Sequence, residues 1–362
     1  MRFLKRIILV IGLAMVAPVG FSGSAEAQSF SQWVNSFWPE ARRAGVSRAI
    51  YDQALQGVTP DQSVLRAASR QPEFVKAVWD YLDGAVSSAR IQRGRALAGQ
   101  HKGTLDAIEA RYGVDRFVLL AIWGMESSYG AVLDNNNIVK PVIRSLATLA
   151  YQGGQRSDFG RQQLIAALQI LQRGDVSPSR MTGSWAGAMG HTQFIPTTYN
   201  AHAVDFDGDG RRNIWYSIPD ALASTANYLR QSGWEPGKTW GYEVVLPQGF
   251  NYALADRKTV RTLAEWSRFG ITRTRARAFP RPGDQAKLVL PAGARGPSFL
   301  MLPNFDAILK YNNSTSYALG VGHLADRIRG GGNFAQGWPR GDRPLTRSER
   351  EELQNLLARR GF

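Results

Sequence analysis

One glutamate stands at the end of an otherwise apolar segment, which is an unusual place for a carboxylic acid. Asp115 is a natural helix N-cap and Gly130 a natural stop, so the sequence between them is predicted to be helical. On that helix Ile122, Trp123 and Glu126 share one face. Desolvation and the negative end of the helix dipole both favour the protonated carboxyl. Glu126 is therefore a candidate general acid for a glycosidic oxygen; the alternative is a glutamate whose head reaches solvent at a frayed helix end.

A second segment combines small residues with polar side chains. The glycines and alanine at 187–190 let the backbone approach a ligand closely, and Ser184 and Gln193 offer polar groups for a sugar hydroxyl or acetamide. Tight helix packing around small residues is the alternative interpretation.

A third segment is an acidic loop. Asp205, Asp207 and Asp209 stand at positions 1, 3 and 5, and a glycine at position 6, as at the start of an EF-hand calcium loop. Position 12 is Tyr216 where a bidentate glutamate is expected, so the loop is not a standard EF-hand. The alternative is a metal-free loop of Asx turns braced by the two arginines that follow it.

Other classes of site have little support. The sequence has four histidines without the HExxH spacing, no cysteine, no G-x-S-x-G elbow and no phosphate-binding loop. Zinc chemistry, thiolate nucleophiles and disulfides are therefore not expected. The formal charge of +15 favours a polyanionic partner, but no basic block is interleaved with aromatics as in a nucleic-acid groove, so nucleic acid is not expected as a partner.

The first 27 residues have the pattern of a cleavable signal peptide. Basic residues precede an apolar run, and Ala25-Glu26-Ala27 supplies the cleavage site, so the mature chain is predicted to start at Gln28. The apolar run is too short to span a bilayer comfortably, and no later stretch reaches about 20 apolar residues. We expect an exported protein without a stable membrane anchor.

Periodicity along the mature chain predicts a mainly α (α+β) fold. Helical spacing dominates, but short β-prone runs lie among Gly, Pro and Arg after residue 240. The predicted units are a helical N-terminal region (28–100), a catalytic core (101–240), a small β-containing insert (241–303), core-completing helices (304–330), and a linker with a C-terminal helix (331–362).

Two of these motifs resemble signatures of lytic transglycosylases with a lysozyme-like core. Met125-Glu126-Ser127-Ser128-Tyr129-Gly130 is similar to their Glu-Ser-x-Tyr/Phe-Gly motif, and the segment 184–196 is similar to the second signature of the membrane-bound lytic transglycosylase B family. The resemblance runs from about Trp33 to Ile328. Further matches are Gln71-Pro72-Glu73-Phe74, Asn227-Tyr228 before Gly233-Trp234, and Tyr311-Asn312 followed by Tyr317-Ala318.

The resemblance implies a lysozyme-like core and a defined reaction. Glu126 would act first as general acid on the bond between N-acetylmuramic acid and N-acetylglucosamine, then as base for the 6-hydroxyl that closes a 1,6-anhydro ring. No water is consumed, so no second carboxylate is required. By the same resemblance the substrate contacts are Ser184, Gln193, Tyr228, Tyr311, Asn312 and Tyr317.

The resemblance also implies a cation in the acidic loop and no organic cofactor. Asp220 would be the late acidic ligand, Arg211 would contribute its backbone carbonyl, and the ion would be calcium, with sodium or an empty loop as alternatives.

Two alternative functions remain open at this point. A hydrolytic muramidase would need an aspartate opposite Glu126, for which Asp134 and Asp158 are the nearest candidates in sequence. A non-catalytic peptidoglycan-binding protein would use the cleft without cutting.

The resemblance carries expectations about location and partners. Members of the namesake branch are lipoproteins, but this sequence has no cysteine, so we expect a soluble periplasmic monomer. The partners would be peptidoglycan glycan strands, with cell-wall synthesis proteins as further candidates. The C-terminal 345–362 looks like the first helix of a peptidoglycan-binding module that then stops.

Overall fold

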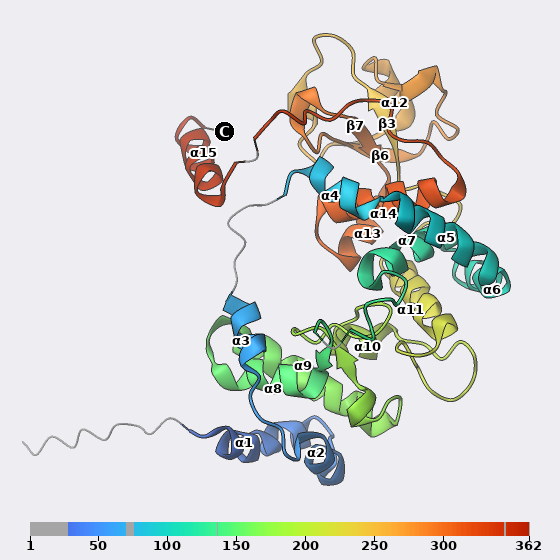
Figure 1. Ribbon diagram of the computed structural model, residues 1–362. Helices are drawn as coiled ribbons and strands as arrows, with labels where there is room; N and C mark the ends of the chain where they lie inside the picture. Colours follow the sequence, from blue (N-terminus) through green and yellow to red (C-terminus); the bar gives the residue numbers. More distant parts are fainter. Residues whose placement is uncertain (1–27, 70–75, 136, 344, 362) are drawn as a thin grey trace, which may run out of the picture.

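The computed structural model describes residues 28–69, 76–135, 137–343 and 345–361. The predicted signal peptide and the motif at 71–74 lie outside these residues. Three hydrophobic clusters divide the described chain into a lower, a central and a strand-bearing lobe, stacked one above the other (Figure 1).

The lower lobe is helical and joins the start of the described chain to a later segment. Its core includes Trp33, Phe37, Leu146 and Leu168, so the first helices pack against helices that follow more than 100 residues later. The lobe consists of α1 (Phe30–Arg43), α2 (Arg48–Leu55), α3 (Gln62–Ser69), α8 (Val142–Gln152), α9 (Ser157–Arg173) and α10 (Pro196–His202), with the short strands β1 (Lys140–Pro141) and β2 (Thr182–Gly183) paired antiparallel beside them.

The central lobe surrounds one long apolar helix. Leu119, Leu120 and Ile122 of that helix are fully buried, and the neighbouring helices cover it on several sides. The lobe consists of α4 (Val78–Ala85), α5 (Ser88–Gln100), α6 (Lys102–Tyr112), α7 (Arg116–Ser127), α11 (Ile218–Gln231), α13 (Pro303–Tyr311) and α14 (Thr315–Arg329).

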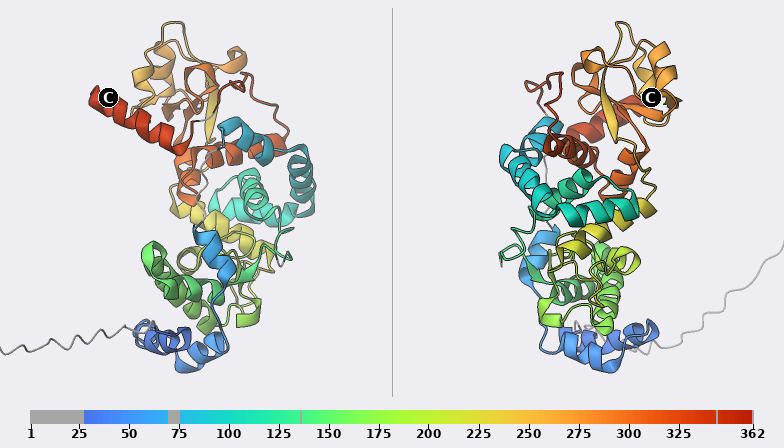
Figure 2. Two further views of the ribbon diagram at one scale, coloured as in Figure 1. Left: turned by 60° about the vertical axis from the view of Figure 1, so that its left-hand side comes forward. Right: turned by 90° about the vertical axis from the view of Figure 1, so that its right-hand side faces the viewer.

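The strand-bearing lobe is a small antiparallel sheet with one helix packed on it (Figure 2). The strand order is β4-β6-β7-β3-β5, and Trp266 of the helix is buried with Leu288 and Leu300 of the sheet. The elements are β3 (Gly241–Val245), β4 (Val260–Thr262), α12 (Leu263–Arg268), β5 (Thr272–Arg273), β6 (Gln285–Val289) and β7 (Ser298–Met301).

The last helix, α15 (Arg347–Arg359), projects from the body of the protein (Figures 1 and 2). It begins at a capping box formed by Thr346 and Glu349. Leu353, Leu356 and Leu357 are exposed on it. Its interpretation as part of a peptidoglycan-binding module stays a prediction.

The predicted fold class is confirmed: the chain is mainly helical and carries one small sheet beyond residue 240. The predicted N-terminal region contributes to two lobes, because α1 to α3 pack in the lower lobe whereas α4 and α5 pack around α7. None of the described helices combines the length and the apolar character that a membrane crossing requires.

Candidate active site

Helix α7 ends directly after Glu126 in a strained turn. Asp115 caps its start, accepting the backbone N–H of Phe117 at 2.8 Å. At the other end Ser128 and Tyr129 both have left-handed backbone conformations, with φ of 51° and 59°. Such conformations cost about 1–3 kcal/mol each in residues other than glycine and are concentrated at functional sites. The turn stops the helix abruptly and leaves Glu126 in its last turn.

The turn is held by close packing against α7 and α5. The ring of Tyr129 folds back onto Gly124, and a Cβ at Gly124 would lie 2.6 Å from the ring. The Tyr129 hydroxyl donates to the backbone carbonyl of Arg90 in α5 at 3.0 Å. Glycine at position 124 is therefore required for the turn that positions Glu126.

His191 attaches the second sequence motif to α7. Burial lowers the pKa of His191 to about 4, so its ring is neutral at physiological pH. Its Nδ1 accepts the indole N–H of Trp123 at 2.9 Å, and its backbone carbonyl accepts the hydroxyl of Ser127 at 3.1 Å. The segment 184–196 is thus fixed against the end of the helix that carries Glu126. Sequence reasoning missed this role, because a lone histidine carries no spacing signal.

Glu126 has the protonation behaviour expected of a general acid. Burial raises the pKa of its carboxyl to about 7, while a hydrogen bond from Tyr317 acts in the opposite direction. The Tyr317 hydroxyl donates to Oε1 of Glu126 at 2.5 Å, from the first turn of α14. Glu126 retains some solvent-exposed surface. Its carboxyl therefore lies in apolar surroundings and remains accessible.

Two further tyrosines interact electrostatically with Glu126. Burial is the main cause of the raised pKa values of Tyr81 and Tyr311, and the Glu126 carboxylate adds to both. Tyr81 comes from α4, where it contacts the same α14 helix that carries Tyr317. Sequence reasoning missed Tyr81, because no pattern around it indicates which residues it contacts.

The remaining predicted tyrosines form an aromatic group beside Glu126. The rings of Tyr228 and Tyr311 meet edge to face with centroids 5.0 Å apart, and Phe194 packs against both. The Tyr311 hydroxyl donates to the carbonyl of Thr192 at 2.6 Å, and that of Tyr228 donates to the carbonyl of Lys310. These bonds fix the rings and engage their hydroxyl protons.

The polar residues of the second motif shape its backbone. The hydroxyl oxygen of Ser184 accepts backbone N–H groups of Ala186 at 3.3 Å and Ala188 at 3.0 Å. Gln193 has φ of 52° and donates its side-chain amide to the carbonyl of Gly190 at 2.9 Å. Both side chains are partly exposed, whereas Asn312 is exposed just after α13. No hydrogen bond joins Asn312 to Glu126 in the part of the chain that the structure describes.

No second carboxylate acts on Glu126 among the described residues. The pKa of Glu126 responds to burial and to Tyr317. Asp134 acts on His191 instead, and Asp158 belongs to the first turn of α9 in the lower lobe. Neither aspartate therefore contributes to the pKa of Glu126 in the described part of the chain.

The acidic loop brings four carboxylates together. Oxygens of Asp205, Asp207, Asp209 and Asp220 lie within 4.8 Å of one another. Asp220 is fully buried in α11, where burial raises its pKa and its oxygens accept three backbone N–H groups of the loop. Arg211 is exposed and its backbone N–H donates to Asp209 at 2.8 Å. A cluster of hard oxygen donors around one point fits a calcium ion.

Comparison with known proteins gives the family. The family model described as a transglycosylase SLT domain matches residues 29–326. The chain therefore belongs to this family of transglycosylases. It is an enzyme, a lytic transglycosylase of peptidoglycan, as the sequence motifs implied.

Individual relatives agree with this assignment. The chain is 29% identical over 323 residues to membrane-bound lytic murein transglycosylase B of Escherichia coli, covering 85% of this chain and 84% of the relative. A crystal structure of SltB3 from Pseudomonas aeruginosa with NAG-anhNAM-pentapeptide is 54% identical, with a TM-score of 0.88 over 92% of this chain and 88% of SltB3. The Escherichia coli lytic transglycosylase SLT35 in complex with calcium is 27% identical, with a TM-score of 0.66 over 87% of this chain and 98% of SLT35.

Proposed function

We propose that Glu126 alone carries the acid and base steps of glycan cleavage. The protonated carboxyl gives its proton to the oxygen between N-acetylmuramic acid and N-acetylglucosamine, and the bond from C1 to that oxygen breaks with its electron pair on the oxygen. The resulting carboxylate then takes the proton of the muramic acid 6-hydroxyl while that oxygen bonds to C1. The product is a 1,6-anhydro ring, and Glu126 ends protonated as it began.

The observation that carries this proposal is the environment of Glu126. Its pKa of about 7 lets one group be acid and base at neutral pH, and no other described carboxylate perturbs it. Complexes of SltB3 with NAG-NAM-pentapeptide and with the anhydro form support the substrate and the product.

The glycan contacts are part of the same proposal. Tyr317 and Tyr311 lie at the carboxyl of Glu126, and Tyr228 extends their aromatic surface. We propose that the partly exposed rings of Tyr228 and Tyr311 stack against sugar faces, that Tyr317 borders the glycan through its hydroxyl at Glu126, and that Ser184, Gln193 and Asn312 bond to sugar polar groups.

Product analysis tests the reaction against its alternatives. Purified sacculi are digested with the wild type and with Glu126→Gln, and the muropeptides are identified by mass. Anhydro ends from the wild type alone are expected; reducing ends would indicate a muramidase, and absence of cleavage a binding protein. Anhydro products released by Glu126→Gln at the wild-type rate would rule out Glu126 as the acid.

We also propose that the acidic loop holds calcium through Asp205, Asp207, Asp209, Asp220 and the Arg211 carbonyl. The clustered carboxylates and the calcium complex of SLT35 support this assignment. A bound calcium would neutralise mutually repelling carboxylates and stabilise the loop; it is not required in any chemical step. Arg211 places a positive charge next to the site, which would weaken binding.

Finally, we propose a periplasmic monomer released by cleavage after residue 27, acting on glycan strands, with cell-wall synthesis proteins as further partners. The signal-like pattern at the N-terminus and the similarity to murein transglycosylase B support this location. N-terminal sequencing of the exported protein and light scattering after gel filtration test the cleavage site and the monomer.

A further inference from the structure

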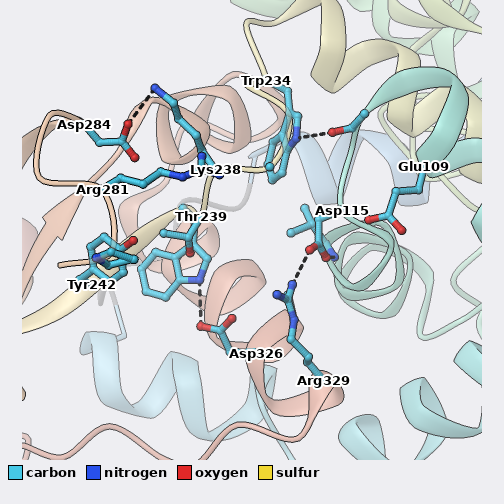
Figure 3. Close-up of a pocket in the computed structure, with 16 residues that line it drawn as sticks. Glu109, Asp115, Trp234, Lys238, Thr239, Tyr242, Arg281, Asp284, Asp326 and Arg329 are labelled. Carbon is cyan, nitrogen blue, oxygen red and sulfur yellow. Dashed lines mark hydrogen bonds and ion pairs between the residues drawn. The ribbon is translucent and has the colours of Figure 1, made fainter. Parts of the chain in front are cut away.

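Two adjoining cavities lie between the strand-bearing lobe and the central lobe, and Figure 3 shows the first of them. Their volumes are about 430 and 260 Å³, and both are lined by Trp240, Tyr242, Asp326 and Arg329. We call the two cavities together the basic groove. It lies at the Asp115 end of α7, so it is about 16 Å along the helix axis from Glu126.

The acidic side chains of the basic groove are already engaged. Each accepts at least one hydrogen bond or forms an ion pair within the protein; Glu109, Asp115 and Asp284 pair with basic side chains, whereas Asp326 and Glu243 accept uncharged N–H donors. Their partners are Arg116 for Glu109, Arg329 for Asp115, Lys238 for Asp284, the indole N–H of Trp240 for Asp326, and the backbone N–H groups of Ala335 and Gln336 for Glu243.

Three arginines of the basic groove lack such partners. Arg281 lines the first cavity, and Arg275 and Arg277 line the second. Within the described ranges none of the three guanidinium groups forms an ion pair with a carboxylate or a hydrogen bond. The two cavities together are lined by six basic and five acidic side chains, and these three arginines supply guanidinium groups that no carboxylate of the described chain engages.

The turn that carries two of these arginines is held in a strained shape. Arg275 and Ala276 have left-handed backbones, with φ of 62° and 51°. Arg273 closes the turn by donating to the carbonyl of Ala278 at 2.6 Å, and its guanidinium lies 4.5 Å from the centre of the Tyr242 ring. Strain of this kind persists where surrounding contacts impose it and is concentrated at binding sites.

We propose that the basic groove binds the carboxylates of a peptide, and that this peptide is a stem attached to the glycan strand. The second half of this inference rests on the proposed function. A guanidinium matches a carboxylate as a two-pronged donor, and the partly exposed ring of Tyr242 offers apolar surface for an aliphatic side chain. The concave shape and the size of the cavities suit a short peptide better than a membrane surface.

In the test, a sugar-free stem pentapeptide is titrated into the full chain carrying Glu126→Gln, and binding is measured by calorimetry. Arg275→Gln, Arg277→Gln and Arg281→Gln are combined in one variant. We expect it to bind at least about tenfold more weakly, because guanidinium–carboxylate hydrogen bonds are charge-assisted. A control variant combines Arg42→Gln, Arg268→Gln and Arg360→Gln, which removes the same charge from exposed arginines outside the groove and should bind as before.

A second arm needs no substitution in the groove. The same pentapeptide with amidated carboxylates should bind at least about tenfold more weakly than the free acid, for the same reason. The proposal would be overturned if the free and the amidated peptide bound equally, or if the triple variant bound the free peptide as well as its Glu126→Gln parent. It would also be overturned if the control variant lost as much affinity as the triple variant, or if no peptide bound at all. Groove-dependent binding of phosphatidylglycerol vesicles without peptide binding would overturn it in favour of a phosphate ligand.

The two proposals fail separately. The peptide titration involves no cleavage, so its failure leaves the role of Glu126 intact. Cleavage by Glu126→Gln at the wild-type rate would contradict the proposed mechanism and leave the peptide titration unaffected.

Discussion

The hydroxyl of Tyr317 lies 2.5 Å from Oε1 of Glu126, joining the first turn of α14 to the last turn of α7. Tyr317 is buried, and the carboxylate of Glu126 is a cause of its raised pKa. Its hydroxyl therefore stays protonated and acts as a donor. A donor to the charged form stabilises the carboxylate and so opposes the effect of burial on Glu126.

Replacing Tyr317 by phenylalanine should move the alkaline limb of the pH–rate profile. Without the hydroxyl donor the pKa of Glu126 rises further, so the acid stays protonated to a higher pH. A hydrogen bond to a charged group contributes about 1.5–3 kcal/mol, so we expect a shift of about one pH unit or more. The measurement is the rate of anhydro-muropeptide release between pH 5 and 9.

Tyr129→Phe is the matched control for this shift. It removes a buried hydroxyl that donates to Arg90 rather than to Glu126. It should lower stability and leave the alkaline limb in place. An unchanged limb in Tyr317→Phe, or an equal shift in Tyr129→Phe, would contradict the assigned role of Tyr317.

Glu126→Gln should stabilise the protein at alkaline pH. The folded pKa of Glu126, about 7, is above its ordinary value of 4.5, so the folded state holds the proton longer than the unfolded state. The wild type therefore loses stability as pH rises from 4.5 through 7, by about 3 kcal/mol at most. The neutral amide avoids this loss.

Urea unfolding of both proteins at pH 4.5 and pH 8 measures the effect. The difference in free energy of unfolding between Glu126→Gln and the wild type should be small at pH 4.5 and favour the variant at pH 8. Other titrating groups cancel in this difference. A difference independent of pH would show that the pKa of Glu126 is the same in the folded and the unfolded protein.

Local sequence patterns predict the position of Glu126 but not the groups around it. The N-cap at Asp115, the stop at Gly130 and the apolar face define the helix and its single acid. Tyr317 lies 191 residues away and was identified only through a family resemblance. No local pattern indicates such a distant contact, because helical periodicity shows that a face is buried without showing what covers it.

Local sequence patterns also do not predict which lobe a helix belongs to. Periodicity predicts helices throughout 28–100, and the structure has helices there, but α1 and α4 belong to different hydrophobic clusters. Their faces are alike in sequence, so the partner of each is determined by contacts far along the chain. Likewise the roles of His191 and Tyr81 depend on distant neighbours that no spacing rule includes.

Gly124→Ala should destabilise the protein although alanine favours helices. The new Cβ would lie 2.6 Å from the Tyr129 ring, which is itself fixed by the left-handed turn. Overpacking of this kind costs about 1–3 kcal/mol. Because the ring supports the turn after Glu126, cleavage should fall as well.

Gly99→Ala is the control for this substitution. Gly99 lies in α5 with nothing within 4 Å of its Cβ position, so alanine should be neutral or stabilise by about 0.5–1 kcal/mol. Thermal and urea unfolding of both variants gives the comparison. Gly124→Ala as stable as Gly99→Ala would show that the Tyr129 ring can move away.

Calcium should raise the unfolding temperature through the acidic loop. Bringing four carboxylates within 4.8 Å without a cation costs electrostatic repulsion, and binding only to the folded state stabilises it by about 2.7 kcal/mol at 100 times the dissociation constant. Chelation should lower the unfolding temperature of the wild type. Asp205→Asn should abolish the calcium response, whereas Asp83→Asn, which alters an exposed acid paired with Arg340, should retain it. Backbone N–H groups already donate to Asp205 and Asp220. Melting curves that do not change with calcium would show that these groups alone offset the negative charge of the loop.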